Sequence, residues 1–547
     1  MKSLIKTIIL LLFSVLSIEI CFGQSNQKDE LRKADSIINN YSQADAPGMA
    51  VGIIRDGKVI EKKIYGLANL ENRIPVTDST AFNIASVSKQ FTAFVVLLAE
   101  QEGKLSLNDD IRIYLPELKH LPYKITIRQL ANHTHGLPEF ANIKRLQGFG
   151  IESRVTNTEA VETVLAIKSI NFPSGEQYKY NNTGFILLAE ILHRIYKKDF
   201  VDLLREYIFN PLHMNYTNVV DDPEKIIPNK SESYRENKRN FTKYTLGQMG
   251  NGASNIFTTL DDLCKWAVNF QNPTVGSREI YQKMQQNTFL STGEKIEYGL
   301  GLQTGKYKGL DIVFHGGGTA GYRSYILHVP AHHLSIVLMS NKAAFDGLFI
   351  AYKLVDLFLE DHEVLASPPR KIAYTSTELK KFEGTYEIDP GNYMEITTDG
   401  KKLYAWGSKT PLESVGDHIF AIPFIPTAHV TFYTGKLTFS IGDFVFTCEK
   451  VILNPLDESK MDLNQFVGHY KNEEFNTIYE LIVKDNKLVA RHAINPEAIL
   501  HPLSPENFYS REPFFGRIHF KYDENNKMKG FILSGSNMFN IEFNKIK

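Results

Sequence analysis

The chain has 547 residues, of which 43 % are hydrophobic and 22 % are charged, and its formal net charge is −1. This composition is ordinary for a globular protein, and the length is sufficient for about three or four domains. The near-zero net charge argues against nucleic acid or a negatively charged surface as a binding partner, because proteins that bind either of them are usually basic.

The N-terminus has the layout of a cleaved export signal. Lysines lie close to the start, residues 8–20 are mostly apolar, and small residues precede Gln24. We expect cleavage between Gly23 and Gln24, which places the mature protein in the periplasm or outside the cell. A lipoprotein anchor at Cys21 is less favoured, because the two residues before it are not small. The apolar run is short for a bilayer span, and no later stretch is long and apolar enough to form one.

Two cysteines remain after the predicted signal is removed. Cys264 and Cys448 fall in different predicted domains. We interpret both as small buried residues rather than as a disulfide or as metal ligands.

Residues 28–365 are predicted to form one α+β domain. An Asp56-Gly57 turn joins two β-rich runs, and further strands follow a central helical region. The helix predicted from Ser86 to Gln101 is apolar nearly all round, which is typical of a helix buried in the core. The other predicted elements lie at 29–41, 48–54, 59–65, 312–314, 322–329, 334–339 and 348–359. Helices packed on an antiparallel sheet account for this order.

The last part of the chain is predicted to be all β. After a linker at residues 366–376, short β runs alternate with turn residues. The run FEGTY, which starts at Phe382, recurs as FVGHY, which starts at Phe466, and each copy contains about eight predicted strands. Eight strands are enough to close a small barrel. We therefore predict two small, lipocalin-like barrels at residues 377–455 and 460–547.

Ser86 and Lys89 form the first candidate catalytic pair, in the run Ser-Val-Ser-Lys. Residues three apart share one face of a helix, so the hydroxyl and the amine point the same way. A serine hydroxyl attacks a carbonyl only when a neighbour takes its proton, and desolvation lowers the pKa of a lysine towards that role. The alternative is a helix N-cap, the usual role of a serine before an apolar helix, and Ser88 is a rival nucleophile.

The second motif is Tyr180-Asn-Asn182, on a predicted loop before the apolar run 185–192. A tyrosine hydroxyl can relay protons, and an asparagine amide can orient a substrate or a lysine. The alternative is a plain turn, because Asn-Asn-Thr-Gly has good turn chemistry.

The third motif is His315-Gly-Gly-Gly318, directly after a short predicted strand. Glycines allow a substrate backbone to approach a strand closely. A backbone N–H here, together with that of Ser86, is suited to an oxyanion hole. The alternative is a flexible glycine turn with a surface histidine.

In their order and spacing, these motifs resemble those of the serine β-lactamase and penicillin-binding-protein-like family. That family includes class C β-lactamases, D-alanyl-D-alanine carboxypeptidases, D-aminopeptidases and family VIII esterases. The resemblance extends to the runs Phe82–Ala93 and Ile125–Pro138 and to Trp266, and it covers about residues 28–365. It implies the β-lactamase-like fold for this part of the chain.

The resemblance also implies catalytic roles. Ser86 is the nucleophile, Lys89 is its activating partner, and Tyr180 is the general base that later protonates the leaving group. The implied activity is that of a serine hydrolase that cleaves a small amide or ester through an acyl-enzyme, with no cofactor.

The substrate side of the site departs from the common pattern. The resemblance assigns substrate binding to Asn182, His315 and Gly317, and the oxyanion hole to the N–H groups of Ser86 and Gly318. His315 stands where class A relatives have a lysine, whose permanent charge can hold a substrate carboxylate. An imidazole with an ordinary pKa near about 6.5 is mostly neutral at neutral pH. We therefore expect that carboxylate-bearing β-lactams are not the preferred substrates.

Three functional hypotheses stay open. The first is a hydrolase of small amides or esters, including short peptides that contain a D-residue, because D-aminopeptidases share the layout of one penicillin-recognising domain with two barrels and a His-x-Gly motif. The second is a D-alanyl-D-alanine carboxypeptidase or a β-lactamase. The third is a non-catalytic penicillin-recognising module that binds ligands. The expected partner is a small molecule or short peptide, and a homo-oligomer is compatible with the sequence.

Two histidine pairs invite a metal interpretation. Neither His133-x-His135 nor His332-His333 has a Cys, Asp or Glu at ligand spacing. We favour structural roles for both, and we expect no metal site.

Lysine at position 315 is expected to favour carboxylate-bearing substrates, because it supplies the permanent charge that histidine lacks. The measurement is kcat/KM of wild type and His315→Lys for two substrates that differ only in one carboxylate. We expect the ratio of the charged to the neutral substrate to rise by about tenfold in the variant. An unchanged ratio contradicts the electrostatic argument.

Overall fold

The computed structural model describes residues 28–237, 240–359, 371–423, 428–441, 444–453, 456, 461–512 and 514–546. The predicted signal at 1–23, including Cys21, lies outside the described residues, as does the first part of the predicted linker at 366–370. Within the described ranges, no helix combines the length and the apolar composition that a bilayer crossing requires.

A six-stranded antiparallel sheet forms the centre of the first domain, in the order β12-β13-β14-β15-β1-β2. The turn between β1 and β2 has positive φ at Asp56 (53°) and Gly57 (71°), as a two-residue hairpin requires. The strand β1 also pairs with β15, so both ends of the domain contribute to one sheet. The strands are β1 (Met49–Arg55), β2 (Lys58–Tyr65), β12 (Gln303–Tyr307), β13 (Leu310–Thr319), β14 (Tyr322–Val329) and β15 (Leu334–Ser340).

Helices cover both faces of this sheet, as the α+β prediction requires. The helical residues 28–39 and α10 (Gly347–Phe358) share one hydrophobic cluster with the strands on the first face. On the other face, α8 (Leu260–Gln271) contacts β1 and β15, and the main helical layer lies beyond it. That layer contains α2 (Ser88–Gln101), α3 (Ile127–Ala131), α4 (Phe140–Leu146), α5 (Asn157–Leu165), α6 (Asn182–Tyr196), α7 (Phe200–Leu204) and α9 (Arg278–Gln285).

The structure differs from the predicted elements at two of the motifs. Ser86 lies in a short 3-10 turn, Ala85–Val87, and α2 itself begins at Ser88 rather than at Ser86. The third motif lies inside β13, whereas the sequence analysis placed it after the strand. Glycine has a low strand propensity, so the sequence pattern did not predict that β13 continues through the three glycines. The ladder with β14 nevertheless holds it extended, with Gly318 opposite Arg323.

Two eight-stranded β units follow, as predicted. In the first, the strands pair continuously in the order β18-β17-β16-β23-β22-β21-β20-β19. A backbone hydrogen bond of 2.8 Å from Leu412, just before β19, to Leu403 of β18 brings the two end strands together. The second unit, β24 to β31, is a closed barrel.

The first unit, which we call barrel 1, consists of β16 (Gly384–Asp389), β17 (Asn392–Thr398), β18 (Leu403–Ala405), β19 (Glu413–Gly416), β20 (Ile419–Ala421), β21 (Ala428–Tyr433), β22 (Lys436–Ile441) and β23 (Phe444–Val451). The second, barrel 2, consists of β24 (Gly468–Asn472), β25 (Thr477–Lys484), β26 (Lys487–Arg491), β27 (Ala498–Ser504), β28 (Asn507–Tyr509), β29 (Arg517–Tyr522), β30 (Met528–Gly535) and β31 (Met538–Lys545). The helix α11 (Ser376–Phe382) precedes barrel 1.

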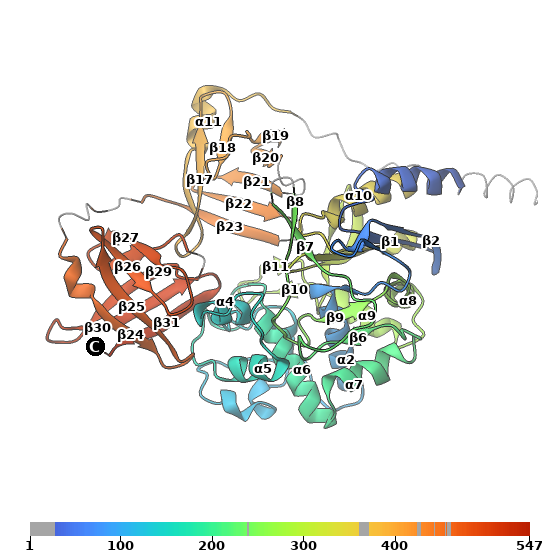
Figure 1. The fold of residues 1–547 in the computed structure, drawn as a ribbon, viewed down its shortest axis with the longest axis horizontal. Helices are drawn as coiled ribbons and strands as arrows, with labels where there is room; N and C mark the ends of the chain where they lie inside the picture. Colours follow the sequence, from blue (N-terminus) through green and yellow to red (C-terminus); the bar gives the residue numbers. More distant parts are fainter. Residues whose placement is uncertain are drawn as a thin grey trace, which may run out of the picture.

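Barrel 2 packs against the helical layer, beside α4 and α5 (Figure 1). The Tyr479 hydroxyl donates to the Leu146 carbonyl at 3.0 Å, and the Gln147 side chain donates to the Phe475 carbonyl at 2.8 Å. Apolar side chains of the barrel interior and of the helical layer belong to one continuous hydrophobic cluster. Barrel 2 and the first domain are therefore joined by a packed interface.

Candidate active site

Ser86 and Lys89 lie where the 3-10 turn meets α2. The Lys89 ammonium is 3.1 Å from the Ser86 Oγ. The turn has a strained backbone, because Ala85 has a φ of 45°. The Asn83 side chain accepts from the Ala85 N–H at 2.7 Å, and Ser324 of β14 donates to the Ile84 carbonyl at 2.6 Å. These contacts hold the serine in one place between the sheet and α2.

Lys89 is completely buried and has no direct carboxylate contact among the described residues. Its Nζ donates to the Asn182 Oδ1 at 2.8 Å and to the Ala253 carbonyl at 2.9 Å, in addition to Ser86. Burial lowers the pKa of Lys89 to about 7, and the more distant Glu139 carboxylate opposes this shift. A lysine with this pKa is partly neutral near neutral pH, so it can accept the proton of Ser86.

The second motif lies directly beside this lysine. The Lys89 Nζ is 4.9 Å from the centre of the Tyr180 ring. The same ring packs against His133 with 4.3 Å between ring centres, and it lies 6.1 Å from the ring of His315. Asn182 is the first residue of α6, and the Asn181 side chain caps that helix. The segment therefore caps α6, as its turn residues predict, and it also contacts Lys89.

Glu139 is a site residue that the sequence analysis missed. Its carboxylate accepts from the Asn182 backbone N–H at 2.6 Å and from the Asn182 side-chain amide at 2.7 Å. Because the amide nitrogen is committed to Glu139, the Asn182 Oδ1 faces Lys89. Burial raises the pKa of Glu139, and the donors from Asn182 oppose this rise. The only sequence signal was its place immediately after the family-like run that ends at Pro138.

His315 is buried and neutral. Only 1 % of its surface is exposed, and burial lowers its pKa to about 3. Its Nδ1 contacts the Gly316 carbonyl at 2.6 Å, and its Nε2 contacts the Tyr298 hydroxyl at 3.0 Å. A carbonyl only accepts hydrogen bonds, so Nδ1 carries the proton and Nε2 accepts from Tyr298. The third motif therefore presents no positive charge at neutral pH.

Gly317 separates β13 from the turn that carries the serine. A Cβ at this position would lie 3.1 Å from the Ser86 nitrogen, and closer still to the Ile84 carbonyl and the Ser324 hydroxyl. The pairing of β12 with β13 ends at Phe314, so the third motif extends beyond the end of β12. An oxyanion hole formed by the N–H groups of Ser86 and Gly318 stays a prediction, and the proximity of Gly317 to Ser86 is consistent with it.

His133 and His135, one of the two histidine pairs, accept hydrogen bonds from the backbone. The Nδ1 of His133 accepts from the Asn181 N–H at 3.1 Å, and the Nδ1 of His135 accepts from the Leu137 N–H at 3.0 Å. His133 also packs against Tyr180 and Tyr298, so it belongs to the wall of the site. Among the described residues, no three His, Cys, Asp or Glu side chains gather in a way that could hold a metal ion.

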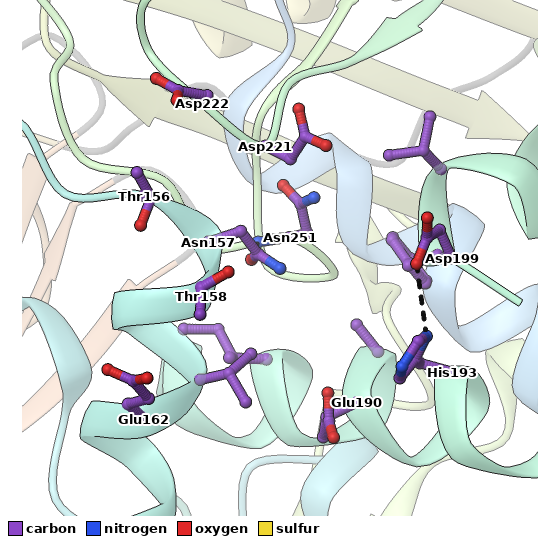
Figure 2. A pocket seen from close by; sticks show the side chains of 15 residues that line it. Thr156, Asn157, Thr158, Glu162, Glu190, His193, Asp199, Asp221, Asp222 and Asn251 are labelled. Carbon is purple, nitrogen blue, oxygen red and sulfur yellow. Dashed lines mark hydrogen bonds and ion pairs between the residues drawn. The ribbon is translucent and has the colours of Figure 1, made fainter. Parts of the chain in front are cut away.

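A separate cavity of about 500 Å³ lies between α5, α6 and α7, and its lining contains none of the predicted site residues. Figure 2 shows its acidic lining, including Glu190 and Asp222. Several of its carboxylates already have cationic partners. Glu190 pairs with Arg194 at 2.6 Å, and Asp222 pairs with Arg154 at 3.1 Å. Because these carboxylates are paired, we do not regard this cavity as a second candidate active site.

Comparison with known proteins places the site in a family context. A family profile described as Beta-lactamase matches residues 34–357. A D-aminopeptidase of Gluconobacter oxydans is 30 % identical over 54 % of this chain and 56 % of its own length. A penicillin-binding protein of Bacillus subtilis is 27 % identical over 71 % of this chain and 88 % of its own length. The chain thus spans only about half of the D-aminopeptidase that it matches.

Solved structures show the same fold. The octameric penicillin-binding protein homologue from Pyrococcus abyssi superposes with a TM-score of 0.55 at 20 % identity, and the match covers 84 % of this chain and 98 % of that protein. The D-amino acid amidase from Ochrobactrum anthropi SV3, in complex with D-phenylalanine, gives a TM-score of 0.52 at 22 % identity, covering 61 % of this chain and 98 % of that protein. At these identities the likeness concerns the fold alone.

Alanine at position 317 is expected to lower kcat by about a hundredfold, because the added methyl group displaces the turn that carries Ser86. The measurement is kcat on any substrate that the wild type turns over. The matched control is Gly305→Ala in β12, where the same methyl group has no neighbour closer than 3.4 Å. Equal kcat values for the two variants would contradict the spacer role of Gly317.

The pH profile of kcat/KM is expected to rise with pH and to have its midpoint near pH 7, where Lys89 loses its proton. Glutamine at position 139 removes the negative charge that favours protonated Lys89. The midpoint should therefore move to lower pH in Glu139→Gln and stay close to that of wild type in Glu139→Asp. A midpoint that stays fixed or rises in Glu139→Gln argues against Lys89 as the titrating base.

Proposed function

Because this chain belongs to the Beta-lactamase family, whose members are mostly serine hydrolases, we propose that it cleaves a small amide or ester through an acyl-enzyme on Ser86. The observation that carries this proposal is the contact between a buried, low-pKa Lys89 and the Ser86 hydroxyl. A module that only binds ligands gains nothing from burying an ammonium group beside a serine, because burial of an unpaired charge is costly.

The proposed reaction begins with the attack of the Ser86 Oγ on the carbonyl carbon while neutral Lys89 takes the hydroxyl proton. Lys89, with its pKa of about 7, thus takes the general-base role that the resemblance gives to Tyr180, and Tyr180 keeps the role of proton donor to the leaving group. The tetrahedral oxyanion is stabilised by backbone N–H groups at Ser86 and Gly318. The bond to the leaving group then breaks, and the proton passes from Lys89 through Tyr180 to the departing nitrogen or oxygen. Water next attacks the carbonyl of the acyl-enzyme ester on Ser86 and gives its proton to Lys89 and Tyr180. That proton returns to the Ser86 oxygen when the acyl bond breaks.

The proposed substrates are D-aminoacyl amides or short peptides with an N-terminal D-residue, followed by simple acyl esters. Two observations support this class over carboxylate-bearing substrates. The neutral, buried His315 offers no charge for a carboxylate, and relatives named D-aminopeptidase match 54 % and 57 % of this chain. A D-alanyl-D-alanine carboxypeptidase or a β-lactamase is the alternative, supported by the match to a penicillin-binding protein.

A substrate panel on wild type and Ser86→Ala tests this proposal. The panel contains D- and L-aminoacyl amides, short acyl esters and a chromogenic cephalosporin. We expect turnover of the D-aminoacyl amides, reduced by at least about 10⁴-fold in Ser86→Ala.

A fluorophosphonate probe followed by mass spectrometry identifies the labelled residue. Label on Ser86 supports the enzyme, whereas a folded wild-type protein that neither turns over the panel nor takes the label supports the non-catalytic module. Turnover restricted to the cephalosporin would favour the alternative substrate class.

A further inference from the structure

The turn between β30 and β31 of barrel 2 reaches into the wall of the candidate active site. Its two central residues, Ser536 and Asn537, have φ values of 51° and 57°, and Gly535 pairs with Met538 across the turn. Positive φ at both positions is typical of the tight two-residue hairpin, which is a stiff connection. The tip of barrel 2 is therefore a rigid element rather than a loose loop.

Asn537 contacts two segments of the catalytic machinery directly. Its side-chain amide donates to the Tyr180 carbonyl at 3.0 Å. Its own backbone carbonyl accepts from the Glu139 N–H at 3.1 Å. One residue of barrel 2 thus binds both the segment that carries Tyr180 and the carboxylate residue that orients Asn182.

Asn171 of the catalytic domain fixes the orientation of the Asn537 amide. The Asn171 amide nitrogen donates to both the backbone carbonyl and the Oδ1 of Asn537, each at 3.0 Å. The Asn171 Oδ1 in turn accepts from the Phe539 N–H at 2.7 Å. Because the Oδ1 of Asn537 is occupied by Asn171, its Nδ2 is left to face the Tyr180 carbonyl.

Barrel 1 holds the residue next to Tyr180. The Lys179 ammonium forms an ion pair of 2.6 Å with Asp389, at the end of β16, and the side chains of both are mostly buried. The same ammonium lies 5.1 Å from the centre of the Phe539 ring of barrel 2. Residues 179 and 180 are therefore fixed from outside the catalytic domain by both barrels.

We propose that Asn537 is a positioning residue for Tyr180, so that barrel 2 completes the proton-transfer geometry of the active site. This inference rests on the proposed function. The hydrogen bond from Asn537 fixes the backbone that carries the Tyr180 ring, so loss of this donor is expected to shift the ring. The step that needs Tyr180 most is the protonation of a poor leaving group, and this step should be the most sensitive to Asn537.

Two substrates with the same acyl group distinguish a displaced Tyr180 from a general loss of active-site structure. A D-aminoacyl p-nitroanilide releases an amine that must be protonated, whereas the p-nitrophenyl ester releases a phenolate that leaves without a proton. Asn537→Gly removes the side chain and tolerates the positive φ of this position. Asn537→Asp keeps the size and the acceptor for Asn171 but cannot donate to the Tyr180 carbonyl.

We expect kcat/KM, which reports the acylation step alone, to fall by about tenfold more for the anilide than for the ester in both variants. The control is Asn540→Gly, because Asn540 also has a positive φ, of 60°, and its side chain donates to the Ile170 carbonyl at 3.2 Å on the same interface. Asn540→Gly should keep the anilide-to-ester ratio of wild type. Thermal unfolding of all four proteins shows whether any loss follows stability instead.

An unchanged anilide-to-ester ratio in Asn537→Gly and Asn537→Asp overturns the positioning role while leaving the proposed function intact. An equal fall for both substrates that tracks the unfolding temperature also overturns it, because that result indicates only a packing role. Failure of the wild type to turn over either substrate overturns the proposed function, and this inference with it.

Discussion

The buried ammonium group of Lys89 is the interaction on which the rest of the site depends. It lies in the core between α2 and α6, where water cannot solvate it, and it is satisfied by a hydroxyl, an amide oxygen and a backbone carbonyl. All three partners are neutral, so the charged form gains no full compensation for its burial. The pKa of the amine falls to about 7 as a result, so part of the population can accept a proton near neutral pH.

The neighbouring features maintain this arrangement. Glu139 is close enough to orient Asn182 but does not contact the ammonium directly, so it limits the depression of the Lys89 pKa without abolishing it. Gly317 leaves the space in which the strained turn at Ala85 can bring Ser86 against the sheet. The neutral pair of His315 and Tyr298 closes the site with hydrogen bonds rather than with a second positive charge, which would otherwise repel protonated Lys89.

The parts of this protein that follow from local pattern could be predicted from the sequence. Alternating and helical periodicity predicted the antiparallel sheet, the buried α2 and two eight-stranded units, and a spacing of three residues predicted that Ser86 and Lys89 share a face. The extension of β13 through three glycines could not be predicted, because only pairing with β14 makes them a strand. Glu139 and Asn537 could not be predicted either. Their partners, Asn182 and Tyr180, are 43 and 357 residues away, and no periodicity connects positions so distant.

The pairing of β1 with β15 has a consequence for how the protein is made. Met49 and Ser340 face each other in the sheet, so the first strand to leave the ribosome has no neighbour on one side until almost three hundred further residues have been synthesised. Contacts between such distant positions form slowly, and an unpaired strand edge is prone to aggregation while it waits. Nascent chains that end before β15 lack the pairing of β1 with β15. Those that end before β13 also lack the glycine-containing strand beside Ser86. The central sheet can therefore be completed only after β15 has been synthesised, because β15 joins β1 to β14.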